Sequence, residues 1–147
     1  MFLIAHRGNI SGPSPLLENS PKYVLDAMEK GFDVEIDVWV INDEIFLGHD
    51  NPESLVSREF VLNDKIWCHA KNLDALTALL KLGATCFWHQ EDDFTLTSNG
   101  FLWTYPGKDL RGSSICVLPE VSSYDDESLL SCSGICSDYV SQYRYLK

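Results

Sequence analysis

Short apolar runs of strand length recur along the whole chain, and only a few of the intervals between them are long enough to hold a helix. Strands that alternate with helical stretches are typical of α/β domains built on a parallel sheet. The predicted strands cover residues 2–5, 33–40, 44–48, 66–68, 85–88, 101–104, 114–118 and 134–136. No interior stretch has the composition of a linker, so we expect one α/β domain that spans residues 1–147.

Two of the intervals carry clear helix signals. Ser20 followed by Pro21 is a typical helix start, and Gly31 ends the helical spacing of the apolar positions 23, 24, 27 and 28. Asn72 can cap a second helix, whose leucines recur at helical spacing up to Gly83. Residues 125–130 have room for one short helix, and residues 107–112 have room for none. Residues 94–97 fit either a hairpin arm or a single helical turn.

The composition excludes several classes of protein. Twenty-two acids against eleven Lys and Arg give a formal charge of −11, whereas a surface for nucleic acid needs positive charge. No apolar run approaches the ~20 residues that span a bilayer, so we expect no membrane span. The five cysteines are an odd number and stand mostly in apolar runs, which predicts buried, reduced thiols. No secretion signal precedes the first strand, and we expect a cytoplasmic protein.

The residues best suited to chemistry follow the ends of the predicted strands, which is where α/β folds place their sites. All four histidines of the chain stand at or just past such ends: His6, His49, His69 and His89. A single histidine at such a position is most often structural. Four at equivalent positions point instead to one shared site.

Two acids occupy an otherwise apolar strand. Glu35 and Asp37 are two residues apart, so their side chains project from the same face. Adjacent buried carboxylates repel each other unless a cation neutralises them. Oxygen ligands of this kind suit Mg²⁺ or Ca²⁺. The alternative is a structural ion pair with Arg7 or Lys71.

Four motifs near the start of the chain resemble those of the glycerophosphodiester phosphodiesterase family. They read Ala5-His6-Arg7-Gly8, Glu18-Asn19, Glu35-Ile36-Asp37 and His49-Asp50, in the order and at the approximate spacing that the family shows. The run GFDVEIDV at 31–38 and the run GICSDY at 134–139 are similar to two further strands of that family. The match is dense over residues 2–50 and sparse in the middle of the chain. Spider-venom sphingomyelinase D enzymes share a related barrel and a similar acid pair.

The resemblance implies a metal-dependent phosphodiesterase that cleaves a glycerophosphodiester or a sugar or lipid head-group phosphodiester, with hydrolase and lyase outcomes both open. It assigns paired acid and base roles to His6 and His49. Arg7 and Lys71 would bind the phosphate, and Glu35, Asp37 and a third ligand would bind the metal. His89 stands where barrel enzymes place substrate contacts, and the rings of Trp103 and Tyr105 could stack on a sugar, so these three are the candidate substrate contacts. The family's third acidic ligand corresponds to His69, so His69 or a substituting acid such as Glu120 would complete the shell of a Mg²⁺ or Ca²⁺ ion.

The family fold is a TIM-type barrel, but a full (β/α)₈ barrel usually needs ~250 residues. Division of 147 residues by eight leaves about 18 per unit, against ~30 for a complete βα repeat. We therefore expect a reduced TIM-type (β/α) barrel of seven or eight mostly parallel strands, with several crossover helices missing or shortened. Because such a barrel has a thin outer wall, we also expect a homo-oligomer.

Two other functions stay open at this point. A non-catalytic or divergent barrel could bind a phosphorylated small molecule, since His69 in place of an acid would leave the metal site incomplete. An isolated metal-binding or interaction module could use His69, His89 and the acidic run at 91–93. The pair of His6 and His49 favours the enzyme, because simple binding does not need two titratable imidazoles.

Overall fold

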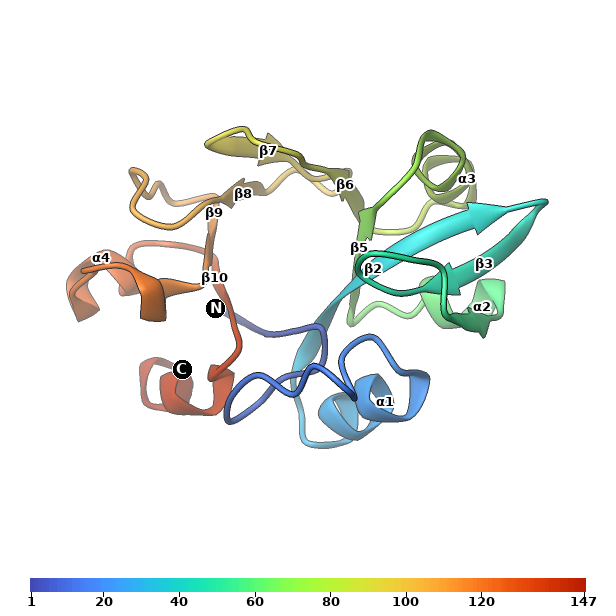
Figure 1. Cartoon of the computed structure of the whole chain (residues 1–147). Helices are drawn as coiled ribbons and strands as arrows, with labels where there is room; N and C mark the ends of the chain where they lie inside the picture. Colours follow the sequence, from blue (N-terminus) through green and yellow to red (C-terminus); the bar gives the residue numbers. More distant parts are fainter.

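A computed structural model describes all 147 residues and contains one ten-stranded sheet (Figure 1). Six of its nine strand pairings are parallel and three are antiparallel. The strands are β1 (Phe2–His6), β2 (Asp33–Ile41), β3 (Glu44–Leu47), β4 (Ser54–Val56), β5 (Ile66–Ala70), β6 (Cys86–Trp88), β7 (Phe94–Leu96), β8 (Leu102–Thr104), β9 (Ser114–Val117) and β10 (Gly134–Ser137). The predicted α/β class with mostly parallel strands is confirmed.

The parallel strands follow the order β6-β5-β2-β1-β10-β9-β8, with β3 and β4 attached to β2 and with β7 attached to β8. Strand β2 is long enough to pair with three partners in succession. Its first residues pair with β1, its middle with β5, and its last residues pair antiparallel with β3. The β2–β3 arm therefore projects away from the other strands, as Figure 1 shows.

The strands curve around a common centre in Figure 1, but the ladder of paired strands does not run all the way round. Strand β6 pairs only with β5, and β7 pairs only with β8. Isolated hydrogen bonds cross the gap between them: Ser98 N donates to Cys86 O at 2.8 Å, and Thr95 Oγ1 donates to Trp88 O at 2.8 Å. The sheet is thus a curved, mostly parallel sheet with an open ladder between β6 and β7.

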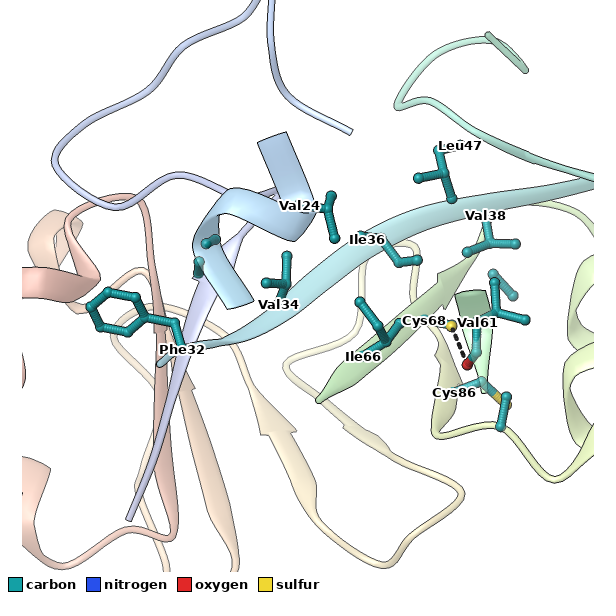
Figure 2. Close-up of a cluster of buried hydrophobic side chains, with 14 of the residues drawn as sticks. Val24, Phe32, Val34, Ile36, Val38, Leu47, Val61, Ile66, Cys68 and Cys86 are labelled. Atoms are coloured by element: carbon teal, nitrogen blue, oxygen red, sulfur yellow. Dashed lines mark hydrogen bonds between the residues drawn. The ribbon is translucent and has the colours of Figure 1, made fainter. Parts of the chain in front are cut away.

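Alternate residues of the parallel strands build two separate cores. One face carries a cluster of seven buried residues: Ile4, Trp67, Phe87, Trp103, Ile115, Val117 and Cys136. The other face packs against the helices in a larger cluster of 24 residues, part of which is drawn in Figure 2. There, Val34, Ile36 and Val38 of β2 lie among side chains from β5 and from the helices. Glu35 and Asp37 alternate with these valines and isoleucine, so they point to the first face.

The helices are α1 (Pro21–Glu29), α2 (Arg58–Val61), α3 (Leu73–Leu82) and α4 (Asp126–Leu130), with 3₁₀ turns η1 (Pro119–Val121) and η2 (Val140–Leu146). The predicted helices α1, α3 and α4 are confirmed. Asn72 caps α3 by accepting a hydrogen bond from Ala75 N, whereas the Ser20 side chain makes no capping bond. Residues 94–97 form the hairpin arm β7 and not a helical turn. Strand β4, helix α2 and both 3₁₀ turns were not predicted.

The five cysteines are free and buried, as their apolar surroundings predict. Cys68, Cys86, Cys116 and Cys136 lie in strands, and Cys132 lies just before β10. None of the helices is long and apolar enough to cross a membrane.

Candidate active site

A cavity of about 440 Å³ opens at the carboxyl ends of the parallel strands, and all four histidines of the chain line it. The lining residues are His6, Arg7, Glu35, His49, His69, Ala70, Lys71, Trp88, His89, Gln90, Trp103, Tyr105, Val117 and Leu118. Of the predicted site residues, only Asp37 and Glu120 are absent from this lining. Residues from distant parts of the sequence therefore meet in one place.

The two acids of β2 form the buried floor of this region. Glu35 is 2% exposed and Asp37 is fully buried, because β2 is covered on both faces. One ligand atom each from Glu35, Asp37 and His69 lie within 4.8 Å of one another. Asp37 Oδ1 is buried and accepts no hydrogen bond. A metal ion would give this buried oxygen the ligand bond that no hydrogen bond supplies.

Asp37 is nevertheless surrounded by positive and polar groups. Arg7 Nε lies 3.0 Å from Asp37 Oδ2, and Lys71 Nζ lies 3.3 Å from Oδ1. Asn19 donates from Nδ2 to Asp37 Oδ2 at 2.9 Å, and its Oδ1 accepts from Asp37 N at 2.9 Å. Burial alone would raise the pKa of Asp37, but the neighbouring His69, Arg7 and Lys71 hold that pKa well below its ordinary value. Asp37 is therefore ionised.

Glu35 is less well compensated than Asp37. Burial raises its pKa, and the charge of Asp37 raises the pKa further. Its nearest polar neighbours are the Arg7 backbone, whose N–H donates to Oε2 at 3.3 Å, and His6 Nε2 at 3.8 Å. The carboxylate of Glu35 thus faces the cavity without a full positive partner of its own.

The surrounding shell adds further negative charge. Glu18 lies against Arg7, with 3.4 Å between Glu18 Oε2 and Arg7 Nη1, and Asp138 lies against His6. Four acidic side chains (Glu18, Glu35, Asp37 and Asp138) therefore lie around only two basic ones, Arg7 and Lys71. If the histidines are neutral and all four acids are ionised, the cluster has two excess negative charges, which one divalent cation would balance.

His6 is oriented by Asp138, which follows the end of β10. His6 Nδ1 lies 2.8 Å from Asp138 Oδ1, and Asn9 Nδ2 donates to the same oxygen at 2.8 Å. Burial would lower the pKa of His6, but the hydrogen bond with Asp138 and the charge of Glu35 outweigh it and raise that pKa. Burial would raise the pKa of Asp138, and its contact with His6 lowers it instead. Ionised Asp138 can only accept, so the proton of neutral His6 lies on Nδ1 and its Nε2 is free.

His69 projects from β5 and lies between the two acids of β2 and the ring of Phe87. Its Nδ1 lies 3.1 Å from Asp37 Oδ1 and 3.9 Å from Glu35 Oε1. Its Nε2 lies 3.1 Å from His89 O, and its ring stacks on Phe87 with centroids 5.0 Å apart. The imidazole is thus fixed on both sides.

His49 has a different environment from His6. It follows β3 and Gly48, and its Nδ1 lies 2.7 Å from Asp50 Oδ1. The side chains of His49 and Asp50 are 44% and 82% exposed. His49 therefore stands at the rim of the cavity, with its partner in solvent.

Aromatic residues form one wall of the cavity. The ring of His89 stacks on Tyr105 with centroids 3.5 Å apart, and His89 Nε2 lies 2.6 Å from Asp92 O. Trp103 also reaches the cavity, but it is only 2% exposed and stacks on Phe87. Trp103 is mainly a core residue, whereas Tyr105 and His89 are available to a ligand.

The structure places Glu120 away from the metal-ligand cluster. Glu120 Oε2 accepts from Ser137 Oγ at 2.9 Å, and Oε1 accepts from Asp138 N at 2.9 Å. Both of its oxygens are therefore used to hold the segment that carries Asp138. Of the two candidates for a third ligand, only His69 lies with Glu35 and Asp37.

Three residues of the site received no role from the sequence. Asp138 orients His6, Asn19 holds Asp37, and Asn9 bridges Asp138 and Glu18. Asp138 directly follows a strand, as the histidines do, and this was the signal that could have identified it. Asn19 belongs to a recognised motif, but its target could not be read from spacing.

Comparison of the chain with protein-family models, with curated proteins and with solved structures finds no match. The resemblance to glycerophosphodiester phosphodiesterases therefore rests on the short sequence motifs alone. Three of the four motifs supply side chains to one cavity: His6 and Arg7 from the first, Glu35 from the third and His49 from the fourth.

Proposed function

We propose that this protein is a metal-dependent phosphodiesterase that cleaves a small phosphodiester by acid–base catalysis with His6 and His49. The observation that carries this proposal is the position of the His6–Asp138 pair beside the cluster of Glu35, Asp37 and His69 in one cavity. A phosphodiester is an anion, and its cleavage needs positive charge at the phosphoryl oxygens together with a base and an acid. The cavity contains side chains suited to each of these tasks.

Glu35, Asp37 and His69 would hold the divalent ion. The buried Asp37 Oδ1, which accepts no hydrogen bond, and the close approach of three ligand atoms fit such an ion. When bound, a divalent ion such as Mg²⁺ or Ca²⁺ supplies positive charge that stabilises the developing charge on the phosphoryl oxygens. Arg7 and Lys71 line the cavity beside this cluster and would bind the phosphate directly.

His6 is the better general base of the two histidines. Asp138 fixes the tautomer that leaves His6 Nε2 free, and it raises the basicity of the imidazole. We propose that Nε2 removes the proton from the attacking oxygen. That oxygen belongs to water or to a hydroxyl of the substrate next to the phosphate. Attack by such a hydroxyl would form a cyclic phosphate as the P–O bond to the other alcohol breaks and that alcohol leaves, and water could open the ring in a second step.

His49 would be the general acid, which donates a proton to the oxygen of the leaving alcohol. Its position at the rim places it near solvent, where a protonated imidazole is readily replenished. The alcohol would lie against the stacked pair of His89 and Tyr105, which offers a flat surface to a sugar ring or a glycerol chain. The cavity volume of about 440 Å³ suits a substrate of this small size.

For the fold we propose a reduced TIM-type barrel. Two features support closure of the sheet into a ring: the hydrogen bonds from Ser98 and Thr95 that link β7 to β6, and the buried cluster on the inner face. The site lies at the carboxyl ends of the strands, as in barrel enzymes.

The test is hydrolysis of an aryl phosphodiester by the full chain. We expect activity that chelator abolishes, that added divalent metal restores, and that His6→Ala reduces by at least about a hundredfold, as expected for a catalytic base. Lys22→Ala, at an exposed position in α1, serves as the matched control. Activity that is insensitive both to chelator and to His6→Ala would refute the proposal. Phosphorus NMR of the products formed from a glycerophosphodiester, which carries a hydroxyl next to its phosphate, would separate hydrolysis from cyclic-phosphate release.

One observation favours a second candidate, a protein that binds a phosphorylated small molecule without turnover. His49 is half exposed and its only side-chain partner is the exposed Asp50, so the second catalytic histidine is weakly held. This candidate predicts calorimetric binding of glycerol phosphate that depends on Arg7 and Lys71, together with no hydrolysis. Detectable turnover that depends on His6 would eliminate it.

A further inference from the structure

We propose that His69 binds the metal through Nδ1 and that this set of two carboxylates and one imidazole selects Mn²⁺, Co²⁺ or Zn²⁺ over Mg²⁺ and Ca²⁺. The inference rests on the metal site of the proposed function and specifies which class of ion that site takes. It is carried by the way the protein fixes the His69 ring, and by the atoms that the ring faces.

The surroundings of His69 determine which of its nitrogens carries a proton. Nε2 lies 3.1 Å from the backbone oxygen of His89, and a carbonyl oxygen can only accept. The proton of a neutral ring is therefore on Nε2, and Nδ1 has a free electron pair. Ligating histidines in metal sites usually donate their other N–H to a carbonyl or carboxylate in this way.

The free nitrogen faces the carboxylates of two acids. Nδ1 lies 3.1 Å from Asp37 Oδ1 and 3.9 Å from Glu35 Oε1. Asp37 Oδ1 accepts no hydrogen bond although it is fully buried, and the cation beside it is Lys71, whose Nζ lies 3.3 Å away. When the neutral ring carries its proton on Nε2, three electron-pair donors converge here, and a metal ion would take the place of the proton that a charged imidazole shares with Asp37 Oδ1. A cation at their centre removes this repulsion and uses all three atoms.

The ring cannot easily turn away from this arrangement. It stacks on Phe87 with an angle of 10° between the planes, and its side chain is only 14% exposed. The carbonyl of His89 is itself held, because the His89 ring stacks on Tyr105 and its Nε2 contacts Asp92 O at 2.6 Å. His89 is therefore a positioning residue that keeps the imidazole of His69 directed at the acids.

The chemistry of the three ligands decides the preference. Mg²⁺ and Ca²⁺ are hard ions that take oxygen ligands, and Mg²⁺ in particular gives up its waters reluctantly. Imidazole nitrogen favours later first-row ions, whose affinity for a given site generally rises from Mn²⁺ through Co²⁺, with Zn²⁺ also a strong binder. Three protein ligands also leave positions of the ion open for water or phosphate.

The experiment is calorimetric titration of the metal-free full chain with MnCl₂, CoCl₂, ZnCl₂, MgCl₂ and CaCl₂ separately. We expect the first three ions to bind at least about tenfold more tightly than the last two. His69→Asp replaces the nitrogen by oxygen and should weaken Co²⁺ and Zn²⁺ binding by about 10- to 100-fold, the usual cost of a disturbed metal site, without weakening Mg²⁺. His49→Gln is the matched histidine control and should leave all five affinities unchanged. The visible absorption of bound Co²⁺ should change in His69→Asp and not in His49→Gln.

The inference is overturned if Mg²⁺ or Ca²⁺ binds as tightly as Mn²⁺, Co²⁺ and Zn²⁺, or if His69→Asp leaves the order of affinities unaltered. Near-UV circular dichroism of each metal-free variant checks that it is folded, and His69→Gln provides a second replacement should the aspartate variant fail to fold. If the predicted order of binding is found but no ion supports phosphodiester cleavage, the enzyme proposal fails and the metal assignment stands. If no divalent ion binds, both are refuted.

Discussion

Asp138→Asn removes the charge that orients His6 while it preserves the size of the side chain. His6 Nδ1 and Asp138 Oδ1 are 2.8 Å apart, and the two side chains are only 16% and 18% exposed. A hydrogen bond to a charged group in such a place is worth about 1.5–3 kcal/mol. Since each 1.36 kcal/mol corresponds to tenfold in rate, we expect kcat/KM for an aryl phosphodiester to fall by about 10- to 150-fold.

The same substitution should also shift the pH dependence of kcat/KM in a defined direction. Burial lowers the pKa of His6, and the contact with Asp138 together with the charge of Glu35 raises it above its ordinary value of 6.5. Without the aspartate charge the pKa of His6 falls. Because the base must be unprotonated, the acidic limb of the kcat/KM profile should move to lower pH even as the plateau drops.

Asp50→Asn is the matched control, because it removes the corresponding partner of His49. That pair is 44% and 82% exposed, and an exposed ion pair contributes about 0.2–1 kcal/mol, so we expect a loss below about fivefold. Equal losses for the two variants, or an acidic limb that stays in place in Asp138→Asn, would refute the role of Asp138. Thermal unfolding of each variant must show that the fold is retained.

Gly8→Ala would bring its β-carbon to 2.7 Å from the ring of Tyr23 at a φ of +91°, whereas Gly31→Ala has the same φ and open space. We expect Gly31→Ala to lower the free energy of unfolding by about 1–2 kcal/mol and Gly8→Ala by at least about 1 kcal/mol more, and equal values in urea unfolding would contradict this. Asn72→Ala removes the α3 cap and two hydrogen bonds to the backbone of β2. It should lower the free energy of unfolding by about 2–3 kcal/mol in the same assay, and a decrease below about 1 kcal/mol would contradict the bridging role of Asn72. Trp103 is 2% exposed, so Trp103→Ala should lower the free energy of unfolding by about 3–5 kcal/mol. A decrease below about 1 kcal/mol would show that Trp103 is not mainly a core residue.

The elements with strong local signals were predicted correctly. Asn72 and Gly83 mark the two ends of α3 because a side-chain cap and a left-handed glycine act within one helical turn. Strand β4 and helix α2 are only three and four residues long, and β4 is a strand because it pairs with β3. The same holds for residues 94–97, where pairing with β8 decides between a strand and a helical turn.

The candidate site was predicted in part. Strand-end position identified the four histidines, Arg7 and Lys71, and all six line one cavity. The partners that tune these residues were not predicted. Asp138 meets His6 across a separation of 132 residues, because β10 lies beside β1 in the sheet. Strand order of this kind depends on packing between distant segments, which local spacing does not contain.

The sequence by itself determined the α/β class, the strands other than β4 and β7, and most of the polar residues at the carboxyl ends of the parallel strands, since alternation, caps and turn residues act over a few positions. Only the tertiary structure decided which atoms face one another. It places Asp37 against Arg7, Asn19 and Lys71, assigns Glu120 to the support of Asp138, and turns His69 Nδ1 toward the acids by giving its Nε2 the carbonyl of His89. The physical reason is that hydrogen bonds and ion pairs require contact within about 3–4 Å, and folding alone brings these separate strand ends to that distance.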